Sequence, residues 1–343
     1  MIVPRDLARD RPAGRGKLVL RWAITALCLV LLAAKIDFES VVPLLAHIDP
    51  MLLGVAIIVM VGDRVFQGAK WYPLLRVQTD RFTPGDAIRS TLAAYPAAIL
   101  LPSGGSEILR AVSLGRTHGL VAEIGASIVM ERVLGLLALL LANLASVVIG
   151  AEVAHHVEDM LPLAALLAMG GVLGLMVLLS DRLRVRAMRW VDRTRHRRIA
   201  ETAARFLQAM AVYGRQRGTV ALVLVLSIAE MVVIAVFMWI LAVALGTAIT
   251  LPMLLLVTPI TLVLVRLPLS IWGLGIAEGA LAFLLALLYQ VPPAQAVAVM
   301  LASRFVEICV ALPGLLLWRH LRIGDRPTRD SEVATPVEEG RVS

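Results

Sequence analysis

Three features of the sequence predict an all-α, polytopic integral membrane protein. Hydrophobic residues make up 59% of the 343-residue chain and charged residues only 17%, whereas soluble domains carry about 25% charged residues. The apolar residues stand in long blocks, most of which reach the roughly 20 residues that a helix needs to cross a bilayer. These blocks are unbroken rather than short and alternating, which excludes an outer-membrane β-barrel.

The apolar blocks predict six full transmembrane helices. We place them at 18–36, 51–70, 121–149, 161–180, 219–245 and 296–318. The first follows a basic N-terminus and lacks a small-x-small cleavage site, so it is a retained span rather than a secretory signal. Two further apolar regions, 84–117 and 252–290, are interrupted in the middle by Pro and Gly. We expect a broken or re-entrant helical hairpin at each, with a surface segment as the alternative for 84–117 and two short spans as the alternative for 252–290.

The distribution of charge predicts the orientation of these helices. The segment 181–218 contains eleven Arg against three acidic residues, and a loop of this kind stays in the cytoplasm. The basic residues 1–17 belong on the same side, so both termini are expected in the cytoplasm. Segments 37–49 and 152–159 have an acidic or neutral balance and belong outside. Because the basic residues lie between apolar blocks, the net charge of +8 sets orientation and does not indicate nucleic-acid binding.

Counting the crossings predicts an inverted repeat with halves at 51–149 and 219–318. Each half reads as span, hairpin, span, and the two hairpins enter the membrane from opposite sides. The interruptions contain Pro, Ser, Gly, Gly and Glu in the same order. They read Leu101-Pro102-Ser103-Gly104-Gly105-Ser106-Glu107 and Leu267-Pro268-Leu269-Ser270-Ile271-Trp272-Gly273-Leu274-Gly275-Ile276-Ala277-Glu278-Gly279.

The predicted organisation is a basic N-terminus at 1–17, a membrane domain at 18–320 and a disordered cytoplasmic tail at 321–343. Within the basic loop 181–218, apolar residues recur at helical spacing beside an Arg-rich face. They are Ile199, Ala203, Phe206, Leu207, Met210 and Tyr213. This pattern predicts an interfacial helix lying on an anionic leaflet. A basic linker that only sets the topology is the alternative.

Ionisable side chains at bilayer depth cost about 2.5 to 3.5 kcal/mol each, so they face a protein interior or an aqueous cavity and form pairs. Those of this chain gather mainly around the two interruptions. They are Asp63, Arg64, Glu107, Arg110, Glu131, Arg132, Glu230, Arg266, Glu278, Arg304 and Glu307. Arg304 and Glu307 stand three apart and can pair within one helical turn. Ser127, Glu131 and Gly135 stand four apart, which predicts a narrow polar stripe facing a neighbouring helix.

These charges support a functional and a structural interpretation. In the functional one, arginines bind an anionic headgroup, because guanidinium groups match phosphate oxygens, and N–H groups at the starts of half-helices add to the anion site. The candidate substrate-binding residues are Arg110, Arg132, Arg304, Ser103, Gly104, Gly105, Ser270, Gly273 and Gly275. The carboxylates that would orient them or carry a coupling proton are Glu107, Glu131, Glu278 and Glu307. In the structural interpretation, the same groups are ion pairs that lock the hairpins in place.

Signatures of soluble enzymes are missing from the sequence. There is no Gly-Lys-Ser/Thr phosphate loop, no His-Glu-x-x-His and no Gly-x-Ser-x-Gly. The two cysteines, Cys28 and Cys309, lie in apolar segments and exclude a disulfide framework. His155 and His156 stand in a polar loop and are expected to be solvated. We therefore expect no metal site, no cofactor and no catalytic residue.

The motifs at the interruptions resemble the lysylphosphatidylglycerol synthase transmembrane-domain family, also called the flippase-like domain family. Leu100–Ala111 and then Glu131-Arg132-Val133-Leu134-Gly135 are similar to the family patterns Pro-Gly-x-x-Gly-Glu-x-x-Arg and Glu-Arg-x-x-Gly. The second motif reads Pro268-x-Ser270-x-x-Gly273-x-Gly275-x-x-Glu278-Gly279, followed by Arg304 and Leu312-Pro313-Gly314. The resemblance covers residues 18–320. Ser103 and Trp272 depart from it, because both stand where glycine is usual.

This resemblance implies a multi-pass protein of the bacterial inner membrane that translocates a phospholipid or a lipid-linked anionic substrate. Its partners would be membrane lipids with anionic headgroups, further copies of the chain or lipid-synthesis enzymes. Larger relatives carry a soluble aminoacyl-transferase domain, and the polar residues after the membrane part are too few for one. We therefore expect no synthase activity. Two alternatives stay open: an intramembrane transferase that uses Glu107 or Glu278 as base on a lipid-linked donor, and a non-transporting partner of a lipid synthase.

Overall fold

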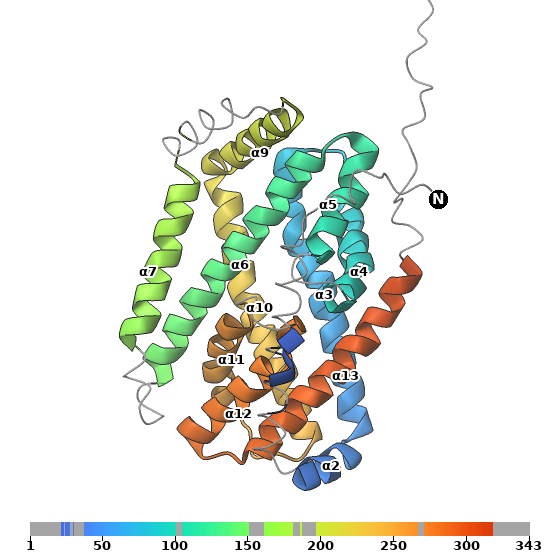
Figure 1. Ribbon diagram of the computed structural model, residues 1–343, viewed down its shortest axis with the longest axis vertical. Helices are drawn as coiled ribbons and strands as arrows, with labels where there is room; N and C mark the ends of the chain where they lie inside the picture. The colour runs from blue at the N-terminus through green and yellow to red at the C-terminus, as the bar shows by residue number, and fades with distance from the viewer. Residues whose placement is uncertain are drawn as a thin grey trace, which may run out of the picture.

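The computed structural model describes residues 38–100, 105–150, 161–180, 197–266 and 271–317, with a few isolated positions before residue 38 and at 186. This part of the chain is a bundle of helices without a strand (Figure 1). The predicted all-α fold is therefore confirmed. Most of the predicted first span and the whole predicted tail lie outside the described residues, as do Ser103, Gly104 and Ser270.

Four of the described helices are long and apolar enough to cross a membrane, and each corresponds to a predicted span. They are α3 (Pro50–Gln78), α6 (Val121–Gly150), α10 (Arg217–Ala244) and α13 (Pro293–Leu317). The predicted span 161–180 appears as the shorter apolar helix α7 (Leu161–Leu178). Helix α3 continues beyond the predicted end at residue 70, because apolar residues such as Leu74 and Leu75 keep the later turns buried.

The two interrupted regions form helical pairs, as predicted. The first pair is α4 (Pro84–Leu100) and α5 (Gly105–His118); the second is α11 (Leu251–Arg266) and α12 (Ile276–Tyr289), joined through the short helix η3 (Ile271–Gly273). Each arm has 14 to 17 residues, fewer than the roughly 20 that a full crossing requires. Both regions are therefore broken hairpins rather than pairs of full spans.

The helices repeat the order span, hairpin, span, with α3–α6 as the first half and α10–α13 as the second. The backbone N–H of Asp49, which caps the start of α3, donates to the carbonyl of Ala244 at the end of α10 (2.9 Å). Helices α3 and α10 thus run antiparallel, and the two hairpins enter from opposite ends. Figure 1 shows α9 at one end of the bundle and α2 (Phe38–Ala46) at the other.

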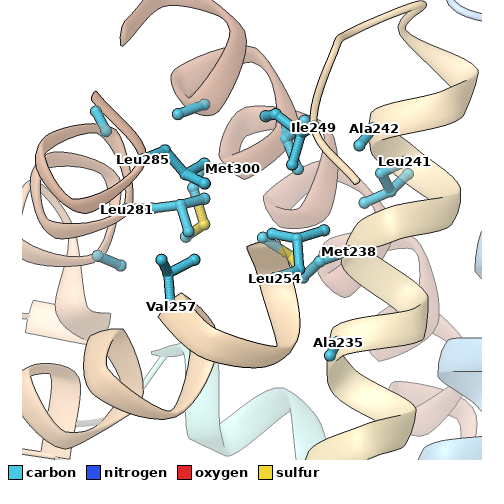
Figure 2. Close-up of a cluster of buried hydrophobic side chains, with 14 of the residues drawn as sticks. Ala235, Met238, Leu241, Ala242, Ile249, Leu254, Val257, Leu281, Leu285 and Met300 are labelled. Atoms are coloured by element: carbon cyan, nitrogen blue, oxygen red, sulfur yellow. The ribbon is translucent and has the colours of Figure 1, made fainter. Parts of the chain in front are cut away.

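The two halves pack through equivalent contacts. Helix α3 packs on α10, the hairpin arm α4 packs on α13, and the corresponding arm α11 packs on α6. At the last contact, the Ser146 hydroxyl donates to the Leu255 carbonyl (2.9 Å). Apolar side chains fill the second half, where Leu254, Leu281 and Met300 meet from three helices (Figure 2). A second apolar cluster, around Trp71, lies nearer the α9 end.

Helix α9 (Arg197–Arg215) forms where the apolar stripe predicted a helix, but the described part of the stripe packs against the protein. Met210 and Tyr213 are buried against α3 and α6. The Tyr213 hydroxyl donates to the Leu74 carbonyl (2.9 Å), and Gln78 donates to the Ala209 carbonyl (2.8 Å). The expectation of a helix lying with its apolar face on the leaflet is therefore corrected: over these residues the stripe packs on the protein.

The contact between α4 and α13 depends on a glycine. A Cβ atom at Gly314 would lie 2.5 Å from the carbonyl oxygen of Leu92 and 2.9 Å from Cδ of Pro96. Small residues at such crossings let helix backbones approach closely, which is how helices associate in lipid. Gly54 in α3 is a contrasting site, because a Cβ there meets nothing within 4 Å.

We predict that Gly314→Ala lowers the free energy of unfolding by about 1–3 kcal/mol, the usual cost of overpacking. The added methyl group must push α4 away from α13. Thermal unfolding of the purified protein in detergent measures the effect, with Gly54→Ala as the matched control. Equal unfolding temperatures for the two variants would show that the helices do not meet at Gly314.

Candidate functional site

Four ion pairs among the described residues join separate helices, and a fifth, Asp63–Arg64, lies within α3. They are Asp63–Arg64, Lys70–Glu230, Arg110–Glu131, Glu107–Arg132 and Glu278–Arg304. All five contain at least one residue predicted to occupy membrane depth, where an unpaired charge is costly. Their exposure differs, and this difference separates pairs that hold the fold from a pair that is open to a ligand.

The pair Glu107–Arg132 is the most open of these pairs. Glu107 stands in the first turn of α5, directly after the first break, and Arg132 projects from α6. The Arg132 side chain is 47% exposed. Arg266, at the end of α11, is exposed and close enough for its charge to repel that of Arg132. The described charges here are therefore two guanidinium groups and one carboxylate, an excess of positive charge.

The pair Glu278–Arg304 is enclosed and acidic. Arg304 donates to Glu278 (3.1 Å) and to Glu307 (3.3 Å), which confirms the pairing predicted from the spacing of Arg304 and Glu307. The guanidinium also lies over the Trp272 ring, 4.4 Å from its centroid, a cation–π contact. One cation thus faces two carboxylates, and the Arg304 side chain is only 12% exposed.

These two pairs occupy equivalent positions in the inverted repeat. Glu107 and Glu278 are both the third residue of the helix that follows a break, counted from Gly105 and Ile276. Arg132 lies as far from the start of α6 at Val121 as Arg304 lies from the start of α13 at Pro293. The repeat therefore contains the same acid–arginine pair twice, more open in the first half and covered in the second.

Arg110, in contrast, is fully enclosed. It donates to Glu131 (2.9 Å) and to the Thr91 hydroxyl (3.4 Å), and it lies over the Trp71 ring at 4.7 Å. The Trp71 indole N–H donates to Ser127 (3.0 Å). The polar stripe of α6 thus faces its neighbours, as predicted, through Ser127 and Glu131. These contacts match the structural interpretation of Arg110, which joins α5, α4, α3 and α6.

A further polar network lies where α3 and α10 cross. Lys70 pairs with Glu230, Gln67 donates to Glu230 (3.5 Å), and Arg64 pairs with Asp63. Arg64 also lies over the ring of Tyr95 in α4 (4.8 Å). Lys70 was not among the ionisable residues predicted at bilayer depth, because the predicted span ends at that residue. The continued apolar pattern after residue 70 was the available signal.

The backbone at the second break is held in an unusual conformation. Gly273 and Gly275 have φ values of 70° and 79°, and Trp272 has a φ of 53°, a left-handed conformation that costs a non-glycine residue about 1–3 kcal/mol. The Gly275 N–H donates to Glu278 (2.7 Å). This predicted anion donor is therefore occupied by the protein's own carboxylate. At the first break, Gly105 is the first residue of α5.

Among the residues that the structure describes, no group of three or more His, Cys, Asp or Glu side chains is placed to hold a metal ion. The chemistry that the open site offers is therefore that of guanidinium groups and a carboxylate. Guanidinium groups bind phosphate or carboxylate oxygens through paired, charge-assisted hydrogen bonds.

The family model for the lysylphosphatidylglycerol synthase TM region matches residues 18–314. No curated protein and no solved structure matches the chain.

We predict that Glu131→Gln lowers the free energy of unfolding by about 3–5 kcal/mol, because it leaves the buried Arg110 charge without its carboxylate. Replacing both residues, as Arg110→Met with Glu131→Leu, should recover most of this loss. Arg132→Gln is the matched control and should cost less than about 1 kcal/mol, because the Arg132 side chain is 47% exposed. Denaturant unfolding in detergent measures all three. An equal loss for Glu131→Gln and Arg132→Gln would contradict the distinction between the two pairs.

Proposed function

The chain belongs to the lysylphosphatidylglycerol synthase TM region family, and on this premise we propose that it translocates a lipid with a phosphate-bearing, anionic headgroup across the membrane. The observation that carries the proposal is the open Glu107–Arg132 site beside Arg266. Arginine forks match phosphate oxygens in geometry and charge. An excess of positive charge next to a hairpin break therefore favours an anionic ligand.

In this proposal, Glu107 takes the place of the headgroup while the site is empty. It keeps the Arg132 guanidinium paired and oriented, and the incoming phosphate replaces it as the partner of Arg132. The exposure of Arg132 and the low exposure of Glu107 fit this exchange, because the arginine is reachable and the carboxylate is held in place by α5. Arg266 adds a second positive charge. Two positive charges favour a phosphate group over the single carboxylate of Glu107 as the partner of Arg132.

The inverted repeat supplies the motion that transport needs. Transporters built from inverted repeats alternate between two states by exchanging the conformations of their halves. The unequal exposure of the equivalent pairs Glu107–Arg132 and Glu278–Arg304 fits one such state, with the first site open and the second closed. In the opposite state, Trp272 would leave Arg304, and the Glu107–Arg132 site would close.

We predict that Arg132→Gln reduces lipid exchange by about 10- to 100-fold, which corresponds to the loss of charge-assisted hydrogen bonds worth about 1.5–3 kcal/mol. The protein is reconstituted in liposomes with fluorescent lipids that differ in headgroup, and exchange between leaflets is measured by quenching. Arg76→Gln is the matched control, because Arg76 is exposed and its contact with Asp80 is long (3.9 Å).

Two outcomes would contradict the transport proposal. One is headgroup-selective exchange by Arg132→Gln at the rate of the unchanged protein. The other is formation of a chemically altered lipid by the purified protein in detergent, where there is no bilayer to cross. That result would favour an intramembrane transferase.

A further inference from the structure

A group of charged side chains extends from the crossing of α3 and α10 to the Glu278–Arg304 pair. Tyr95 of α4 connects its two parts: the Arg64 guanidinium lies over the Tyr95 ring (4.8 Å), and Tyr95 is close enough to Arg304 and Glu307 to interact with their charges. Glu307 also lies close enough to Arg64 for the two charges to attract. The group, which we call the crossing network, consists of Asp63, Arg64, Lys70, Glu230, Glu278, Arg304 and Glu307.

The crossing network contains more acids than bases. Four carboxylates stand against three cations, so one negative charge is left over when every group is ionised. An uncompensated charge at this depth is costly, and a buried acid usually avoids the cost by binding a proton and becoming neutral. We therefore expect the network to hold a proton at neutral pH.

Asp63 is the carboxylate with the least compensation. Its side chain is only 3% exposed, and one of its oxygens, Oδ2, accepts from the Arg64 guanidinium. The other oxygen, Oδ1, is enclosed by protein atoms and has no hydrogen-bond partner among the described residues. Glu230, across the helix crossing, is close enough to repel a charge on Asp63. Two carboxylates that share a buried site rarely both ionise, because burial and mutual repulsion both favour the neutral acid.

The other three carboxylates of the network are better satisfied. Both oxygens of Glu230 and both oxygens of Glu278 accept hydrogen bonds. Glu307 accepts from Arg304 (3.3 Å), and its side chain is 20% exposed, so water can solvate its charge. Asp63 is therefore the group on which the proton lies.

The surroundings of Asp63 fit a proton and no larger ligand. Because Oδ1 is enclosed, no metal ion or organic group can reach it in this structure. Cations such as Mg²⁺ and Ca²⁺ also need about six oxygen ligands, and no cluster that could hold a metal ion occurs in the described part of the chain. A proton needs only the oxygen itself, and Arg64 can donate to Oδ2 whether Asp63 is charged or neutral.

The titratable groups around Asp63 come from four helices. From α3, α10, α4 and α13 they are Arg64, Lys70, Glu230, Tyr95, Arg304 and Glu307. Helix α6 also packs on α3, but its Glu131 is paired with Arg110. Helix α9 meets α3 at Leu74, about three helical turns from Asp63. The proton on Asp63 therefore responds to the crossing of the two halves and to the second break.

The charge of Asp63 controls how the cations of the network are shared. When Asp63 is neutral, Arg64 can balance Glu307, and Arg304 stays with Glu278. When Asp63 loses its proton, its charge holds Arg64, and Glu307 must rely on Arg304 alone. This competition weakens the Glu278–Arg304 pair, which is the covered pair of the inverted repeat.

We propose that Asp63 binds the coupling proton of the transport cycle, so that lipid movement is driven by a proton gradient. Asp63 takes up the proton from one side of the membrane, keeps it while the second site is closed, and releases it to the other side when the second site opens. The proton adds to Oδ1 and leaves from the same atom, and the lipid is not chemically altered. The inference deepens the proposed function, on which it rests for the lipid, whereas the proton site is tested by itself.

The first experiment detects the proton by infrared absorption of the full-length protein in detergent at neutral pH, since a protonated carboxyl group absorbs apart from a carboxylate. We expect this band in the unchanged protein and its loss in Asp63→Asn. Asp80→Asn is the matched control, because Asp80 is 93% exposed just after the same helix, and it should keep the band. Isotope-labelled aspartate should shift the band in the unchanged protein, which identifies the group even where Asp63→Asn does not fold.

The second experiment tests the coupling in liposomes by measuring the distribution of fluorescent lipid between the leaflets. If one proton moves with each lipid, a pH difference of about one unit shifts this distribution by up to about tenfold. Asp63→Asn should exchange lipid without responding to the pH difference, and Asp80→Asn should respond as the unchanged protein does. A difference in Na⁺ concentration should have no effect.

The two experiments separate the proton site from transport. Absence of a protonated carboxyl band, or a band that neither Asp63→Asn nor labelled aspartate changes, would overturn the proton site. Lipid exchange that ignores the pH difference, or that follows the Na⁺ difference instead, would overturn the coupling. The expected band in a protein that moves no lipid would disprove the transport proposal and leave the proton site on Asp63 in place.

Discussion

The fold depends on the need to neutralise charge inside a membrane bundle. Charged groups there have little water to face, so each must find an oppositely charged partner. Lys70–Glu230 joins the crossing helices α3 and α10, Arg110–Glu131 joins α5 to α6, and Glu278–Arg304 joins α12 to α13. Aromatic rings add a second partner for Arg64, Arg110 and Arg304. Pairing therefore fixes the short hairpin arms, which are too short to be placed by spanning the bilayer.

The proposed function depends on how the inverted repeat places these pairs. Equivalent positions in the two halves carry the same acid and arginine, yet Arg132 is half exposed and Arg304 is covered by Trp272 and faced by two carboxylates. Trp272 keeps a left-handed backbone conformation at this place. Strain of that kind persists only where the surroundings hold it, and the Arg304 guanidinium lies over this Trp272 ring. In the proposed transport cycle, departure of Trp272 from Arg304 would uncover the second site.

The sequence was sufficient to predict the helical membrane fold, the two broken hairpins and the local pair Arg304–Glu307, because these depend on hydropathy and on spacing within one helix. It did not identify the partners of Arg110, Arg132 and Lys70, since those contacts join separate helices whose packing is set by the whole bundle. The stripe of α9 was assigned to lipid, because an apolar face has the same pattern whether lipid or protein covers it.

The central claim is that Arg132 binds the headgroup, whereas Glu107 only keeps Arg132 in place. Exchanging the two residues, as Arg132→Glu with Glu107→Arg, preserves the ion pair and removes the arginine from the side of α6 that faces Arg266. We expect this double variant to unfold at the temperature of the unchanged protein and to lose most headgroup-selective exchange in liposomes. Restored exchange in the double variant, after loss in each single variant, would show that the pair only locks the hairpin and would contradict the account.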